Sequence, residues 1–89
     1  MDPGVLAAIR LLPKHKQAIR ELVMSSENFR SLCVDLGEAK QALRRWESSD
    51  APEMAARRVE YQHLVAGLEA ELRESIREWE ARPHADRRE

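Results

Sequence analysis

The sequence has few of the residues that tight turns and covalent cross-links require. Its 89 residues include three glycines, four prolines, one cysteine, one phenylalanine, one tyrosine and two tryptophans. So few glycines and prolines argue against an all-β fold, which needs many tight turns. A single cysteine cannot form an internal disulfide, which fits a reducing compartment.

A long apolar run and a strong net charge are also missing. The first apolar run covers only Val5 to Ile9 before Arg10 interrupts it, whereas a bilayer-spanning helix needs ~20 apolar residues. Asp2 places a negative charge where a secretion signal carries positive ones. Lysine and arginine number 15 against 16 acidic residues, so no global field favours nucleic acid or an anionic membrane. We therefore expect a soluble cytoplasmic protein without membrane contact.

What is present favours helix. Alanine, leucine, glutamate and arginine are abundant, and all four are good helix formers. In two stretches, apolar side chains recur at alternating spacings of three and four residues, as in helices that pack lengthwise on one another. The first stretch comprises Phe29, Leu32, Leu36, Ala39, Leu43 and Trp46, and the second comprises Met54, Tyr61, Val65, Leu68 and Leu72, with Arg58 as a polar member. We predict an all-α fold whose main unit, residues 25–82, is a long antiparallel two-helix hairpin resembling a coiled coil.

The two stretches match each other across the polar segment 48–53. In an antiparallel pair, residues whose numbers have a constant sum share a layer. Trp46 then faces Met54, and Ala39 faces Tyr61, so that a small side chain meets a large one, as good packing requires. These apolar side chains are the predicted hairpin seam.

A shorter helical arm, residues 1–24, is predicted to precede the hairpin. Asp2 followed by Pro3 is typical of a helix start, with an N-cap and then proline at the first helical position. Pro13 disfavours helix at the residue before it, so either a short helix ends near Leu12 or one helix kinks there. The apolar spacing keeps its helical phase through Pro13, which favours a kinked, near-continuous helix.

The hairpin helices have their own boundary signals. Residues 25–28 prefer caps to helix interiors, which predicts a break, with Ser26 capping a helix that runs to Glu47. Gly37 lies inside that helix, and we interpret it as a tolerated surface glycine; the alternative is close backbone approach by another helix.

Asp50, Pro52 and Glu53 form the pattern of an N-cap, a first turn and a capping box for a last helix over about residues 51–81. Pro83 ends that helix. Residues 83–89 are predicted to be a polar, frayed tail.

The last helix is longer than its partner, so its final apolar residues need a cover. The arm is expected to supply it, either within its own chain or from a second copy. The candidate interface between chains, or with a partner protein, is Val5, Ile9, Leu12, Ile19, Leu22, Ile76 and Trp79. The stretch from Val5 to Leu12 has three possible settings. It can pack within the same chain, dock to another protein or dock to a membrane surface. A chain this small has little core, so we expect a homo-oligomer or a protein partner.

No residue pattern indicates chemistry. His15, His63 and His84 lie far apart, and Cys33 has no second thiol or basic cluster nearby. A general base also needs a pocket that excludes water, which two helices do not offer. We therefore predict no catalytic, cofactor or metal site, no small-molecule substrate, and no enzymatic activity.

These observations predict a non-enzymatic helical module that self-associates or docks a partner protein through apolar helix faces. The alternative is a small nucleic-acid accessory protein that uses arginines 44, 45, 57 and 58 at the hairpin tip. Carboxylates at the same end and the lack of an aromatic stacking platform disfavour nucleic acid as a partner.

The central stretch resembles a known family. The spacing of Phe29-x-x-Leu32, Leu43 and Trp46-Glu47 is similar to the first long helix of the YdcH-like family of small bacterial proteins. Ser26 stands where the family has a capping aspartate. The resemblance covers roughly residues 19–76.

The chain also departs from the family pattern. Leu36 stands where the family usually has histidine or tyrosine, and Ala39-Lys40 stands where it has Leu-Asp. The resemblance implies a helical hairpin and implies no biochemical role.

Overall fold

The computed structural model describes residues 2–83, and these residues form helices and no strand. In chain order they are α1 (Pro3–Leu11), a single 3₁₀ turn (Pro13–His15), α2 (Lys16–Ser25), α3 (Glu27–Glu47) and α4 (Met54–Ala81). The predicted all-α class is therefore confirmed. Of the predicted frayed tail, residues 84–89 lie outside the described part. None of the described helices is both long and apolar enough to cross a membrane.

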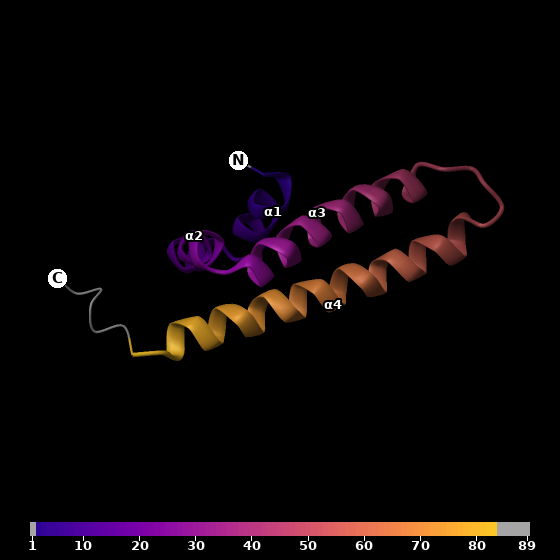
Figure 1. The fold of residues 1–89 in the computed structure, drawn as a ribbon. Coiled ribbons are helices and arrows are strands. Elements are labelled where there is room, and N and C mark those ends of the chain that lie inside the picture. Colours follow the sequence, from indigo (N-terminus) through magenta and orange to yellow (C-terminus); the bar gives the residue numbers. More distant parts are fainter. Residues whose placement is uncertain (1, 84–89) are drawn as a thin grey trace.

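The two longest helices, α3 and α4, pack closely and run side by side in opposite directions (Figure 1). The chain turns back between them at residues 48–53. The shorter helices α1 and α2 gather at the other end of the α3/α4 pair (Figure 1). The loop end of the pair therefore consists of two helices only, whereas four helices meet at the opposite end.

Helix α4 begins at Met54, so the predicted N-cap at Asp50 is wrong. Glu53 is the residue before the helix, and its side chain forms no capping hydrogen bond. The Ser49 hydroxyl accepts the Ala51 N–H at 3.0 Å, and the Met54 N–H donates to the Ala51 carbonyl at 3.0 Å. Residues 50–53 are thus taken up by a turn before the helix can start.

The predicted kinked, near-continuous helix through Pro13 is also wrong. Helix α1 ends at Leu11, and Leu12 adopts φ −132° and ψ 66°, outside the helical region. This follows from the clash between a proline ring and a helical residue before it. The predicted start is confirmed, because an Asp2 carboxylate oxygen accepts the N–H groups of Gly4 at 2.8 Å and Val5 at 3.2 Å.

The predicted break near residues 25–28 is confirmed. Helix α2 ends at Ser25, and Ser26 is extended, with φ −131° and ψ 114°. The Ser26 hydroxyl accepts the Phe29 N–H at 3.1 Å and so satisfies one of the free donors at the start of α3.

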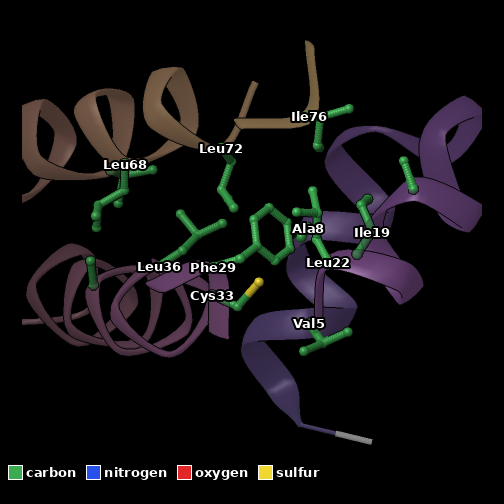
Figure 2. Close-up of a cluster of buried hydrophobic side chains, with 13 residues drawn as sticks. Val5, Ala8, Ile19, Leu22, Phe29, Cys33, Leu36, Leu68, Leu72 and Ile76 are labelled. Carbon is green, nitrogen blue, oxygen red and sulfur yellow. The ribbon is translucent and has the colours of Figure 1, made fainter. Parts of the chain in front are cut away.

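The hydrophobic core lies where all four helices meet (Figure 2). Its most fully buried large side chains are Ile19, Phe29, Leu36, Leu72 and Ile76. Phe29 lies near the centre of this cluster, at the start of α3 (Figure 2). Burying each side chain of this kind contributes about 1.5–3 kcal/mol, so these five residues stabilise the packing of the four helices.

Helix α1 packs on α3 at a close glycine contact, so the interpretation of Gly37 as a tolerated surface glycine is wrong. A Cβ built on Gly4 would lie 1.8 Å from the Cys33 carbonyl oxygen, and one built on Gly37 would lie 3.0 Å from the Gly4 Cα. The backbones of the two helices can approach this closely only because neither glycine has a side chain.

Candidate interaction surface

The structure places every predicted seam residue at least partly out of solvent. On α3 and α4, the buried members are Phe29, Leu36, Ala39, Val65, Leu68 and Leu72, and the half-buried ones are Leu32, Leu43, Trp46, Met54 and Tyr61. Two further residues of α3, Cys33 and Ala42, are buried although they lie outside the predicted stripe. Cys33 is buried because α1 covers its side of α3, and Gly37, one turn further along, was the available signal for that contact.

The predicted interchain set is held largely within a single chain. Val5, Ile19, Leu22 and Ile76 are buried, whereas Ile9, Leu12 and Trp79 are half-buried and pack against the core. The arm therefore covers the end of α4 in its own chain, and this set does not form an open face. Among the three settings considered for the stretch from Val5 to Leu12, the structure shows packing within the chain.

Polar contacts hold the arm on α4 as well. The Trp79 indole N–H donates to a Glu21 carboxylate oxygen at 2.9 Å, and His15 Nδ1 lies 2.7 Å from a Glu80 carboxylate oxygen. Both contacts join the arm to the last turns of α4. The two contacts give hydrogen-bond partners to polar side chains at the edge of the apolar contact between the arm and α4.

A different apolar surface is open at the loop end. A hollow of about 470 Å³ lies between α3 and α4 and is lined by Asp35, Glu38, Ala39, Gln41, Ala42, Arg45, Tyr61, Leu64 and Leu68. A neighbouring hollow of about 280 Å³ is lined by Trp46, Arg57, Glu60, Tyr61 and Leu64. Tyr61 and Leu64 line both hollows, which are therefore neighbours, and we call the two together the α3/α4 groove.

The groove has an apolar floor and a charged rim. Ala39 and Ala42 form part of the floor, and Leu64 remains 48% exposed. At the loop end, an Arg57 guanidinium nitrogen lies 2.8 Å from a Glu60 carboxylate oxygen, so these two charges are paired. The groove thus combines small and large apolar side chains with charged ones.

The side of α3 next to α1 has a second hollow. It measures about 410 Å³ and is lined by Pro3, Leu6, Ala7, Arg10, Leu11, Gly37, Lys40 and Arg44. One of its cations, Lys40, lies 3.7 Å from a Glu69 carboxylate oxygen on α4. Arg44 therefore belongs to this hollow, whereas Arg45 belongs to the α3/α4 groove.

The four arginines proposed for nucleic acid do not share one surface. Arg45 and Arg57 both line the α3/α4 groove, but Arg57 is paired with Glu60. Arg44 lines the hollow beside α1, and Arg58 is half-buried. Phosphate binding depends on several cations that face one backbone. This geometry lends the nucleic-acid alternative no support.

Reactive groups are sparse in the described part. Burial raises the pKa of the Cys33 thiol to about 11, and the nearby Asp2 carboxylate adds to the shift, so the thiol is protonated at neutral pH. Within residues 2–83, no three histidine, cysteine, aspartate or glutamate side chains are placed to hold a metal ion together.

Comparison of the chain with models of protein families, with curated proteins and with solved structures gave no match. The resemblance to the YdcH-like family therefore stays a prediction, and the case for a function depends on the geometry alone.

Proposed function

We propose that this protein is a non-enzymatic helical interaction module that docks another helical surface in the α3/α4 groove. In this proposal α3 and α4 act as one antiparallel hairpin, and α1 and α2 act as a proline-interrupted arm that stabilises the end opposite the loop. The observation that carries the proposal is the open apolar surface of Tyr61, Leu64 and Trp46 beside the small residues of α3.

The position of the core supports separate roles for the arm, which stabilises one end, and for the groove, which docks a partner. The arm already covers the apolar residues at its own end, so the stability of the chain does not depend on a partner there. At the loop end, two helices bury only one stripe each, and a flank of that stripe stays in contact with water. A helix laid in the groove removes that apolar area from water, at about 25 cal/mol per Å².

The side chains of the groove are of the kind that dominates protein interfaces. Tyrosine and tryptophan bury large areas and lose little conformational freedom on binding, and they recur where alanine scanning locates binding energy. Trp46 and Tyr61 are each half-buried in the isolated chain, so part of each ring is held in place while part is available for contact.

Site-specific photocrosslinking tests the proposal. A photoreactive phenylalanine derivative replaces Leu64 in the groove, or Val59 as the matched control. Both residues lie on α4 and are 48% exposed, but Val59 does not line the groove. Irradiation of cells that express each variant should give a protein adduct at position 64 and none at position 59. Equal adducts at both positions, or none at position 64, reject a docking role for the groove.

A further inference from the structure

Five charged residues line the α3/α4 groove, namely Asp35, Glu38, Arg45, Arg57 and Glu60, and among them Glu38 and Arg45 lie on α3 with opposite signs. Glu38 and Arg45 are both exposed and both line the groove. They are seven residues apart, which is about two helical turns, so they lie on the same side of α3. Neither forms an ion pair or a side-chain hydrogen bond with another residue in the range 2–83. Their midpoint falls between Gln41 and Ala42.

We infer that the occupant of the groove is a second copy of this chain, packed antiparallel about a two-fold axis that passes beside α3, level with the midpoint between Gln41 and Ala42. The inference rests on the proposed function and names its partner. In a two-fold interface the same patch serves both copies, so whatever residue i contacts in the partner, the partner's equivalent contacts in return. An axis at this midpoint brings each Glu38 to the Arg45 of the partner, and the pair forms twice.

The charges also select the direction of packing. If the two α3 helices were parallel and in register, each Glu38 would face Glu38 and each Arg45 would face Arg45. Like charges placed opposite one another disfavour that arrangement, whereas the antiparallel arrangement pairs every one of them. These exposed ion pairs add little affinity and chiefly determine orientation.

The apolar residues supply the affinity. Ala39 and Ala42 are small and already buried in their own chain, so they leave a hollow beside α3 into which a second α3 fits, and they add little contact area themselves. Tyr61 and Leu64 on α4 stand beside this line and bury their exposed parts against the partner. The four helices that meet, α3 and α4 from each copy, then form a four-helix arrangement around one shared apolar centre.

The position of α1 determines which side of α3 is open. α1 lies against α3 at Gly37, where the backbones leave no room for another helix. The groove lies on the other flank of the α3/α4 contact, which is lined by residues of α3 and α4 alone. A second copy therefore meets the first through this flank, with both arms directed away from the interface.

Solution mass is the first test. Sedimentation equilibrium of the full chain at micromolar concentrations should give twice the 10.3 kDa mass of the chain. Leu64→Glu should give the monomer mass, because it places a carboxylate in the apolar groove. Val59→Glu, at the same exposure but outside the groove, should leave the dimer intact. Far-UV circular dichroism establishes that each variant is folded.

Charge reversal tests the symmetry. Glu38→Arg and Arg45→Glu should each weaken dimerisation about tenfold or more, because either one places like charges together twice. The double variant, Glu38→Arg with Arg45→Glu, should return the dissociation constant to within about threefold of wild type. An unrelated partner protein would not show this rescue, since it has no reason to carry the complementary pair.

The outcomes separate the inference from the proposed function. A monomeric wild type whose photoreactive position 64 captures a different protein overturns the second copy and leaves the groove as a docking site. A dimer that survives Leu64→Glu, or charge reversals that the double variant does not rescue, also overturns the inference. A monomer with no adduct at position 64 rejects both.

Discussion

Adding a single methyl group at Gly4 should separate α1 from α3. In Gly4→Ala, the new Cβ would lie 1.8 Å from the carbonyl oxygen and 2.4 Å from the carbonyl carbon of Cys33. Both atoms belong to the α3 backbone, so no side chain can rotate away. Reaching the 3.0 Å lower limit of real Cβ contacts from 1.8 Å requires a shift of about 1.2 Å between the two helices.

The cost of that shift can be bounded in two ways. If α1 stays docked and the core strains, overpacking by one methyl group costs about 1–3 kcal/mol. If α1 instead detaches, burial of Val5, now 7% exposed, is lost at about 1.5–3 kcal/mol. Either route predicts that Gly4→Ala lowers the free energy of unfolding by about 1–3 kcal/mol.

The other glycines provide matched controls. Gly37→Ala should destabilise less, since its Cβ would lie 3.0 Å from the backbone of Gly4, a separation that a smaller shift can relieve. A Cβ on Gly67 would meet nothing within 4 Å, so Gly67→Ala should stabilise α4 by about 0.5–1 kcal/mol, the usual gain within an exposed helix.

Urea denaturation followed by far-UV circular dichroism, at one fixed protein concentration, measures all three variants. The test is that the free energy of unfolding falls in Gly4→Ala and rises in Gly67→Ala. If Gly4→Ala were as stable as the wild type while Gly67→Ala gained stability, the close crossing of α1 and α3 would be refuted.

Three further predictions concern single side chains. Leu72→Ala, at a fully buried position, should lower the free energy of unfolding by about 2–5 kcal/mol, and Leu32→Ala, at a half-buried one, should lower it clearly less. Equal losses of the two variants in urea denaturation would contradict the placement of the core. Ser26→Ala should cost about 1 kcal/mol through loss of the cap on the Phe29 N–H, and an unchanged melting temperature would argue against that cap. The Cys33 thiol has a pKa of about 11 in the fold against an ordinary value of 9.0, so the unfolded chain loses this proton first as the pH rises. The contribution of the protonated thiol to the free energy of unfolding should therefore be fully present below about pH 9 and be lost between about pH 9 and 11, by up to about 3 kcal/mol. In alkaline unfolding, Cys33→Ala should lack this loss.

Local chemistry explains what could be predicted from sequence. The helix starts at Asp2 and Ser26 depend on one side chain and a backbone donor three residues or fewer away. The all-helical class follows from apolar spacing that extends over many turns. Even so, a local signal failed at Asp50, since the Ser49 hydroxyl accepts the Ala51 N–H and α4 begins only at Met54.

Contacts between distant residues explain what could not be predicted. Gly4 and Gly37 meet only after α1 has docked, so Gly37 can signal a close backbone approach in the sequence but cannot identify the helix that makes it. The arm is expected to cover the end of α4 either in its own chain or from a second copy, and in the structure Val5, Ile19 and Leu22 are buried within their own chain. The position of the open groove could not be predicted for the same reason. A helical stripe has two flanks, and the docking of α1 determines which of them stays uncovered.

The most direct test of the α3/α4 groove as the contact between two copies of this chain is an NMR dilution series on the isotopically labelled full chain. If two copies meet in the groove, the amide signals of Ala42, Tyr61 and Leu64 shift with protein concentration, while those of Val59 and Gly67 stay in place. Concentration-dependent shifts centred on Val59 and Gly67, or signals that do not change at any concentration, would contradict this contact.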